Sequence, residues 1–403
     1  MKGGSMDNRD NTNEWSLLVF LCKQGFVQGA DDAYSVFSLK NIDWTVLMKY
    51  AKFHRVKSLM HQGMMKWSQK HLVPVEILEH LKMIHHQRSF INLDHTKELI
   101  QIVLLLEGKG VEVIPYKGVV LAQEAYQNIG LRDMSDIDIL IKLEDFDLIK
   151  QVFRERGYVA SKDVPTKFEA TFFKQNFEYN FDFFENDKRK YHAEPHWKIG
   201  FKRWQTNLDF HDIFPFTRKK SFFGTQMNIL TPEGLLLTTS LHHGGEDRWN
   251  SIKYISDVAA ILYTFEKELN WELLIKKATK LRVINIILLG VGVAVKIFGI
   301  SVPDHVYQLA SSKKLAKHVK LVDDQLQLIE RTANINTYFK DIRFHFSLRK
   351  SPITKFKVLY YHFTGILVPT LYDVNEAKNS GKHYRWLFLT KPLRIWRTHI
   401  KSK

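Results

Sequence analysis

Two aspartates, Asp136 and Asp138, stand two residues apart inside an apolar run from Met134 to Ile141. On a β-strand, side chains at positions i and i+2 point to the same face, so both carboxylates would project together. Two like charges held this close repel each other, and burial adds to the cost unless a cation pairs with them. A hard divalent ion such as Mg2+, bound through carboxylate oxygens, is the natural partner. An Asp-x-Asp pair on a surface strand is also often only a solvated face, so the pair alone leaves both interpretations open.

A Lys-Gly turn, Lys117-Gly118, lies upstream of this pair. It separates a strand-like segment that starts at Val111 from a helix expected to run to about Tyr126. A glycine at such a turn lets the backbone approach a phosphate, and the helix N-terminus offers unpaired N–H donors. Lys117 adds a mobile positive charge. The turn and the aspartate pair together predict a phosphate cradle followed by a metal-binding carboxylate pair.

If the site holds two metal ions, it needs more than two ligands. A third acidic residue should therefore come from a neighbouring strand. Glu194 is the candidate, because Glu194 and His196 are again i and i+2 on a presumed strand from Tyr191 to Ile199. Asp182, on the preceding aromatic-rich run, is the competitor. We expect His196 to orient Glu194 or to pack in the core rather than to bind a metal directly.

The elements around these residues predict an α+β fold. Helical periodicity covers residues 13–106, and mixed signals follow from Val111 to about Ile199. The expected strands and helices in this mixed part are strand Ile137–Ile141, helix Glu144–Arg156 closed by Gly157, and strand-like runs at Phe168–Phe173, Phe177–Phe184 and Tyr191–Ile199 with a turn at 185–187. Helices return after Thr231-Pro232. We therefore divide the chain into an N-terminal helical region (1–95), a catalytic core with a small mixed sheet (96–230), a helical domain (231–330) and a basic C-terminal helical and loop segment (331–403).

Composition sets the class of protein. With 45% hydrophobic and 25% charged residues, the chain is an ordinary globular sequence. Its one cysteine, Cys22, excludes an internal disulfide and a cysteine-rich zinc site. The longest runs without charged residues, at 358–372 and 283–295, are too short to span a bilayer. The N-terminus has no signal-peptide pattern, so we expect a soluble, cytoplasmic protein.

The net charge of +16 is concentrated at the C-terminus. Residues 331–403 contain 15 Lys and Arg against three acidic residues, a balance of +12. A basic segment with interleaved aromatic residues can contact a polyanion such as a nucleic acid or an anionic membrane surface. The alternative is that the aromatic residues form the core of amphipathic helices whose outer faces are basic.

These motifs resemble those of a bacterial family of uncharacterised nucleotidyltransferases, a branch of the polymerase-beta-like superfamily. The chain from Tyr116-Lys117-Gly118 through Arg132 to Asp136-Ile137-Asp138 is similar to that family's Lys-Gly … Arg … Asp-x-Asp block. Glu194-Pro195-His196-Trp197 is similar to its Asp-Leu-His-Trp element. A later helical stretch with His243, Trp249 and Asp257 also fits, as does a closing element at Pro369, Asp373 and Lys391 to Arg394. Two residues depart from the pattern: Val119 follows Gly118 where the superfamily has Ser or Gly, and Glu194 replaces an aspartate.

The resemblance implies a reaction and a set of roles. A nucleoside monophosphate would pass from an NTP, with ATP as one candidate, to a hydroxyl of an acceptor, and pyrophosphate would leave. The implied catalytic and metal-binding residues are Asp136, Asp138 and Glu194, holding two Mg2+ ions or alternatively Mn2+. Lys117, Gly118 and Arg132 would bind the nucleotide, and His196 and His243 would support the site.

Several points stay open at this level. Arg132 either braces the triphosphate or forms a salt bridge with Asp133 or Asp136. His242 and His243 lack a third ligand at a recognisable metal spacing, so helix packing or an acceptor pocket is favoured over a zinc site. The acceptor is a small molecule, a sugar, a peptide, a protein or an RNA. The competing functions are a degenerate fold that binds nucleotide or a partner without turnover, and a nucleic-acid-binding adaptor that uses the basic tail.

Overall fold

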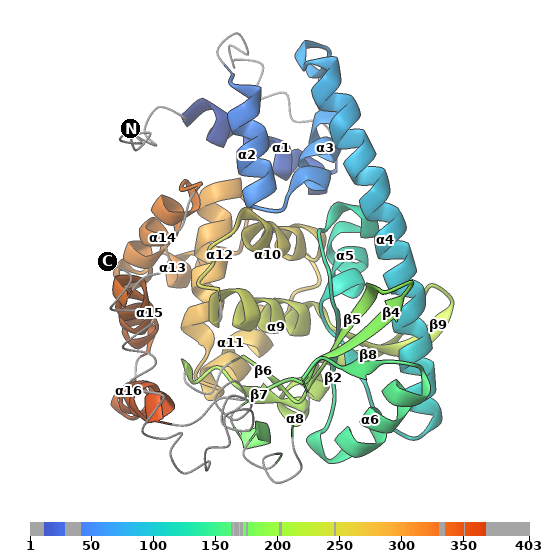
Figure 1. Cartoon of the computed structure of the whole chain (residues 1–403). Coiled ribbons are helices and arrows are strands. Elements are labelled where there is room, and N and C mark those ends of the chain that lie inside the picture. Colours follow the sequence, from blue (N-terminus) through green and yellow to red (C-terminus); the bar gives the residue numbers. More distant parts are fainter. Residues whose placement is uncertain are drawn as a thin grey trace, which may run out of the picture.

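The computed structural model describes residues 12–28, 42–162, 164, 169, 172–174, 176–200, 204–245, 247–329, 335–349 and 351–367. Helices lie on both sides of a small sheet in the order of the chain, as the colours of Figure 1 show. The α+β class predicted from the sequence is therefore confirmed. The predicted closing element from Pro369 to Arg394 lies outside the described residues.

Helices precede the sheet, as the sequence predicted. They are α1 (Thr12–Phe26), α2 (Trp44–Phe53), α3 (Lys57–Lys66), the 3-10 helix η4 (Lys70–Leu72) and α4 (Val75–Gly108). Helix α4 is 34 residues long and runs beside the sheet (Figure 1). Its residues Leu99, Val103 and Leu106 are buried in the same apolar cluster as the strands. This packing fixes the long helix against the sheet.

The central sheet has five strands: β1 (Ile114–Pro115), β2 (Ile137–Leu140), β3 (Val159–Ala160), β4 (Phe181–Glu185) and β5 (Lys188–His196). Their spatial order is β1-β2-β5-β4-β3, with β2 and β5 parallel and the other neighbours antiparallel. Between these strands lie α5 (Gly118–Tyr126), η5 (Ile129–Leu131), η6 (Leu143–Asp145) and α6 (Phe146–Glu155). Asn186 and Asp187 join β4 to β5, and their positive φ angles of 50° and 59° suit a tight two-residue hairpin turn.

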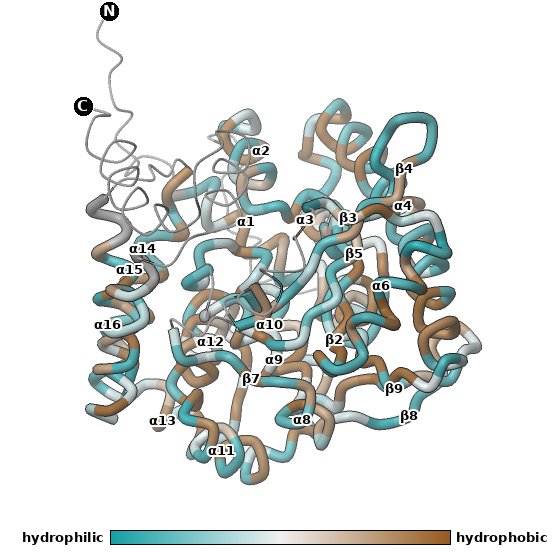
Figure 2. The backbone as a smooth tube through the Cα atoms, turned by 60° about the horizontal axis from the view of Figure 1, so that its bottom comes forward, coloured by the Kyte–Doolittle hydropathy of each residue, from teal (hydrophilic) through white to brown (hydrophobic). Residues whose placement is uncertain are grey.

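Strand β2 is buried along its whole length, as expected for a strand in parallel pairing. Ile137, Ile139 and Ile141 belong to the apolar cluster between the sheet and helices α4 and α6. Leu140 belongs to a second cluster formed with the helices on the other face. Figure 2 shows this strand as an apolar stretch among hydrophobic segments. A charged residue within such a strand, as Asp138 is, needs a specific partner.

The rest of the described chain is mainly helical. Two small hairpins come first, β6 (Lys198–Ile199) with β7 (Leu208–Asp209) and β8 (Thr217–Phe222) with β9 (Thr225–Leu230), together with α8 (Phe210–Ile213) and η8 (Phe214–Phe216). The helices that follow are α9 (Pro232–Gly245), α10 (Ile252–Thr264), α11 (Trp271–Lys280), α12 (Ile284–Phe298), α13 (Asp304–Ala310), α14 (Lys313–Leu326), α15 (Ile335–Leu348) and α16 (Pro352–Leu367). Among the described residues, none of these helices has the length and apolar character needed to cross a membrane.

One predicted strand is wrong. The run Phe168–Phe173 was expected to be extended, but its described residues 169, 172 and 173 are helical. Phe172 and Phe173 pack edge-on against Trp197, and Phe173 also contacts Phe146. A short aromatic-rich run has the same composition in a strand and in a buried helical turn, so its pattern does not separate the two.

Candidate active site

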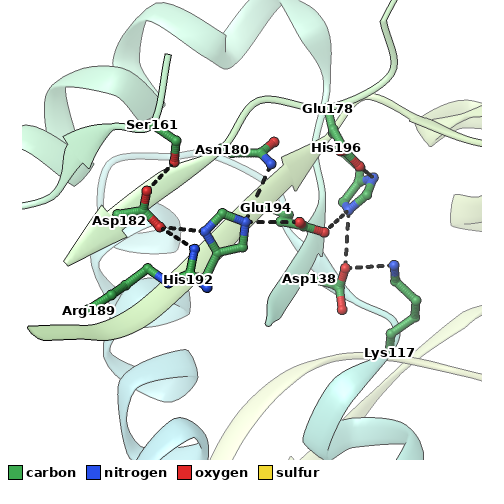
Figure 3. Close-up of polar contacts among 10 residues, drawn as sticks. All are labelled: Lys117, Asp138, Ser161, Glu178, Asn180, Asp182, Arg189, His192, Glu194 and His196. Atoms are coloured by element: carbon green, nitrogen blue, oxygen red, sulfur yellow. Dashed lines mark hydrogen bonds and ion pairs between the residues drawn. The ribbon is translucent and has the colours of Figure 1, made fainter. Parts of the chain in front are cut away.

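Strands β2 and β5 bring the predicted acids together. Asp138 on β2 and Glu194 on β5 are direct partners in the parallel pairing. Asp136 comes just before β2, two residues from Asp138, and is half-buried. Figure 3 shows Asp138 and Glu194 facing each other across the two strands. The sheet register therefore brings three carboxylates together, although Asp136 and Glu194 are 58 residues apart in the sequence.

Lys117 reaches this cluster from the turn before α5. Its ammonium lies 2.7 Å from the Asp138 Oδ1 atom, and both side chains are almost fully buried. Gly118 begins α5 with φ +56°, in the left-handed region that favours glycine. A Cβ atom at this position would lie 3.3 Å from the carbonyl oxygen of Asp136. The Lys-Gly turn and the aspartate strand are thus in close contact, with the N-terminus of α5 beside the acids.

Two histidines on β5 flank Glu194. His196 Nε2 lies 3.2 Å from Asp138 Oδ1 and 3.6 Å from Glu194 Oε2. His192 Nε2 lies 3.1 Å from Glu194 Oε1. The predicted orienting role of His196 is compatible with these contacts. His192 was missed, although the alternation of His192, Glu194 and His196 along one strand is a signal that could have found it.

Asp182, the competitor for the third acidic position, holds His192 instead. Its Oδ1 atom lies 2.6 Å from His192 Nδ1, and its Oδ2 atom accepts a hydrogen bond of 2.5 Å from Ser161. Figure 3 shows the resulting chain from Asp182 through His192 to Glu194. A carboxylate bonded to the far nitrogen of an imidazole fixes the orientation of the ring. Asp182 thus positions His192, which in turn contacts Glu194. A further acid that sequence reasoning missed, Glu178, lies 3.4 Å from His196 Nδ1.

The charges of the cluster compensate one another. Burial and the neighbouring carboxylates Asp138 and Glu194 raise the pKa of Asp136. Burial opposes ionisation of Asp138, but Lys117 and His196 outweigh it and lower the pKa of Asp138. For Glu194 the same opposition from burial is overcome by hydrogen bonds from both histidines, and its pKa falls well below the ordinary range.

The two histidines respond in the opposite sense. Hydrogen bonding to Glu194 raises the pKa of His192 to about 9, against the effect of burial. Burial lowers the pKa of His196, but its bonds to Asp138 and Glu194 prevail and raise it to about 9. Lys117 and the two histidines thus neutralise the negative charge of the carboxylates, and a divalent ion bound to the carboxylates would neutralise it in their place.

The donor atoms fit such an ion. Asp136, His192 and Glu194 each offer one ligand atom, and these atoms lie within 4.8 Å of one another. The same holds for Asp138, Glu194 and His196. Glu194 belongs to both groups, so one carboxylate stands where it can bridge two ions. The carboxylate oxygens of each group suit the Mg2+ or Mn2+ expected from the sequence, and its histidine, which lies against Glu194, would orient that carboxylate while the oxygens hold the ion.

Arg132 and His243 lie in a separate buried network centred on Asp257 of α10. The Arg132 guanidinium forms two parallel contacts with the Asp257 carboxylate, at 3.0 and 3.1 Å. His243 Nε2 lies 2.8 Å from Asp257 Oδ2, and the Tyr126 hydroxyl donates to Asp257 Oδ1. The salt bridge of Arg132 is therefore with Asp257, while Asp133 pairs with Arg88 of α4 and with Arg55 in the turn between α2 and α3. The network ties the end of α5 to the helical layer.

Comparison with known protein families identifies the family of this chain. The family model described as "Uncharacterised nucleotidyltransferase" matches residues 40–299, a range that includes every residue placed in the site above. No curated protein matches the chain, and no solved structure does.

Proposed function

This chain belongs to the uncharacterised nucleotidyltransferase family, and we propose that it transfers a nucleoside monophosphate from an NTP to an acceptor hydroxyl and releases pyrophosphate. The observation that carries this proposal is the register of β2 and β5. It sets Asp138 beside Glu194, with Asp136 within reach and the Lys117-Gly118 turn against the same strand. Paired carboxylates next to a phosphate-binding turn are what a metal-dependent phosphoryl-type transfer needs.

Each residue has a distinct role in the proposed reaction. Asp136, Asp138 and Glu194 would hold Mg2+, which when bound neutralises the triphosphate and polarises the attacking and leaving oxygens. Lys117 would move from Asp138 toward the phosphates and stabilise the charge that develops on the leaving pyrophosphate, together with N–H groups at the start of α5.

The bond changes in this reaction are simple. The acceptor oxygen forms a bond to the α-phosphorus as the bond from that phosphorus to the bridging oxygen breaks. The hydroxyl proton of the acceptor passes to water, and pyrophosphate leaves with the electrons of the broken bond. Glu194, kept ionised by His192 and His196, would orient the acceptor hydroxyl for this attack.

A second candidate is a fold that binds nucleotide without turnover. Val119 favours it, because this side chain follows the glycine of the turn but is 2% exposed and packed in the apolar cluster. Valine has no hydroxyl for a phosphate, unlike the serine at this position in the wider superfamily, and it has a side chain that the alternative glycine lacks. Under this alternative, Mg2+ and NTP bind but no product forms.

Labelled nucleotides separate the two candidates. Each of the four α-labelled NTPs is incubated with the protein, Mg2+ and a cell extract, and the labelled species are identified. The transferase predicts a labelled product that Asp136→Asn and Asp138→Asn abolish. Asp147→Asn is the matched control, because that carboxylate is 90% exposed on α6 and outside the site. Equal labelling by wild type and both site variants would rule the transferase out. NTP binding without labelling would favour the second candidate.

The basic segment 331–403 enters the proposal as a contact for a polyanionic acceptor such as RNA. Its charge balance of +12 is the supporting observation. Binding of an RNA homopolymer should then weaken steeply with salt. A chain that ends at residue 367 lacks eight of the 15 basic residues and should show a smaller salt slope, whereas Asp138→Asn should keep the full slope. An adaptor function without catalysis predicts this binding and no labelled product.

A further inference from the structure

A second cluster of metal-ligating side chains lies beside the carboxylate site, whose Lys117, Asp138 and His196 act electrostatically on His242. His242 and His243 end helix α9, and Asp247 follows in the turn before α10. One ligand atom from each residue lies within 4.8 Å of the other two. The sequence suggested no third ligand for the histidine pair. The turn supplies one, only four residues beyond His243.

The distances within the cluster are short enough for one metal ion to be bound after a small movement. The Nδ1 atoms of His242 and His243 are 3.2 Å apart, and His242 Nδ1 is 3.8 Å from Asp247 Oδ2. Ligand atoms bound to one zinc ion at about 2.0–2.1 Å lie about 3.3 Å from one another in tetrahedral geometry. The first separation already fits this value, the second is about 0.5 Å longer, and the third, between His243 and Asp247, is within 4.8 Å. Binding an ion therefore requires Asp247, which is 31% exposed on a turn and hydrogen-bonded with Tyr254, to move toward the histidines.

The surroundings orient the cluster as those of metal-binding histidines do. His243 Nε2 donates to the buried Asp257 carboxylate at 2.8 Å, which leaves the lone pair of the ring on Nδ1, toward His242. Asp257 itself is fixed by Arg132. The Tyr254 ring stacks on His243 at a centroid distance of 4.2 Å. Two contacts, with Asp257 and Tyr254, therefore hold the His243 ring, and its Nδ1 lone pair accepts from His242 Nδ1 where a metal ion would replace the shared proton.

We propose that His242, His243 and Asp247 bind one transition-metal ion of the Zn2+ class, distinct from the Mg2+ expected at the carboxylate site. Two imidazole nitrogens and one carboxylate oxygen favour zinc over magnesium, because Mg2+ prefers oxygen ligands throughout. Three protein ligands leave a fourth position for water or a substrate group. The ion would join the end of α9 to the turn before α10. This proposal does not depend on the proposed transferase activity.

Metal content tests the proposal directly. Tag-free full-length protein is stripped of metal, kept in excess Mg2+ to fill the carboxylate site, and titrated with Zn2+ against a chromogenic chelator. We expect one bound Zn2+ in wild type, in Asp138→Asn and in His80→Gln, a control for adventitious binding by an exposed histidine on α4. His242→Gln and Asp247→Asn should weaken binding by more than the roughly 10–100-fold that loss of an outer hydrogen-bond partner costs.

Two results would overturn the proposal. One is that wild type binds no Zn2+ in excess Mg2+. The other is that Asp138→Asn loses the ion while His242→Gln keeps it, which would place the zinc in the carboxylate site.

Cobalt spectroscopy keeps the test valid if the variants fold poorly. Co2+ bound to wild type should give the strong visible bands of a four-coordinate ion. It should show no thiolate charge-transfer band, because the single cysteine, Cys22, is buried in α1. The weak spectrum of a six-coordinate ion would contradict the tetrahedral site.

Discussion

Asp138 and Glu194 face each other as register partners on parallel strands β2 and β5, and His192 and His196 stand on either side of Glu194 at 3.1 and 3.6 Å. A one-residue slip in this pairing would turn Glu194 to the opposite face of the sheet. Tyr191 and Ala193, which alternate with Glu194 on β5, are buried in the apolar cluster and would leave it in such a slip, so their packing opposes it. The packing of the sheet thus sets the geometry of the site.

We expect the site to be more sensitive to loss of the charge of Glu194 than to shortening of its side chain. Glu194→Gln keeps the shape but removes the charge shared by both ligand groups, so we expect transfer activity to fall by at least about 100-fold. Glu194→Asp keeps the charge and draws it back toward β5, and it should retain more activity than the glutamine variant. Initial rates of labelled-product formation measure both. Equal rates for the two variants would show that the charge of Glu194 is not what the reaction uses.

Gly118 should be irreplaceable for a reason of backbone geometry. An alanine there must adopt φ +56° and place its Cβ atom 3.3 Å from the Asp136 carbonyl oxygen. We expect Gly118→Ala to lower the free energy of unfolding by about 1–3 kcal/mol and to weaken binding of Mg·ATP. Gly108→Ala is the matched control, because a Cβ atom at this helix end meets nothing within 4 Å. Urea unfolding and calorimetric titration of the nucleotide give the two values. Unchanged nucleotide affinity in Gly118→Ala would separate the turn from phosphate binding.

Arg132 should matter first for stability. Arg132→Met would leave the Asp257 carboxylate buried without its guanidinium partner, at a cost of about 3–5 kcal/mol. Lys109→Met breaks an ion pair with Glu155 whose side chains are 35% and 52% exposed, and it should change stability by less than about 1 kcal/mol. Urea unfolding compares them. Similar midpoints for the two variants would mean that water or another group compensates Asp257.

A conservative variant tests whether Arg132 also braces the triphosphate. Arg132→Lys keeps the charge beside Asp257 but loses the two parallel contacts of the guanidinium. If Arg132 acts only through Asp257, the folded variant should bind Mg·ATP as wild type does. A marked loss of affinity in a variant that is still folded would instead support the triphosphate role.

Much of the local structure could be predicted because it depends on short-range signals. Helix α9 begins at Pro232 as expected, with Thr231 Oγ1 accepting from the Gly234 N–H group. Helix α6 stops before Gly157, whose φ is +86°. The Lys-Gly turn and the Asp-x-Asp strand also lie where their sequence places them. In each case, one residue type has a conformational or capping preference that acts within a few positions.

Long-range contacts were beyond the sequence. The partner of Arg132 is 125 residues away on α10, so no spacing rule could favour Asp257 over the adjacent Asp133. Asp247 lies close to His242 and His243 only because of the conformation of the turn that follows α9. His192 belongs to the site because Asp182 on the neighbouring strand orients it, which depends on strand pairing. Pairing register and turn path are settled by the whole core, not by neighbouring residues.

Lys253 should make stability rise with pH in the alkaline range. Its side chain is 7% exposed on α10. Burial, with repulsion from Arg132 and Arg55, lowers the pKa of its ammonium to about 7. The unfolded chain keeps the ordinary lysine pKa of about 10.4, so between pH 7 and 10 the unfolded state binds more protons than the folded state. The free energy of unfolding from this group therefore increases with pH in that window, by up to about 1.4 kcal/mol per pH unit, and it is lowest below pH 7.

Replacing Lys253 isolates this contribution. Lys253→Met removes the buried ammonium, so it should be more stable than wild type at pH 6.5, and the difference in stability should narrow steadily as pH rises toward 10. Lys82→Met removes an ammonium whose side chain is 53% exposed, and it should follow the wild-type pH dependence. Urea unfolding at pH 6.5, 7.5 and 8.5 gives the three curves. A constant difference between Lys253→Met and wild type across these values would mean that Lys253 keeps its proton in the folded protein, held by Asp257 and Asp133, whose attraction opposes the shift.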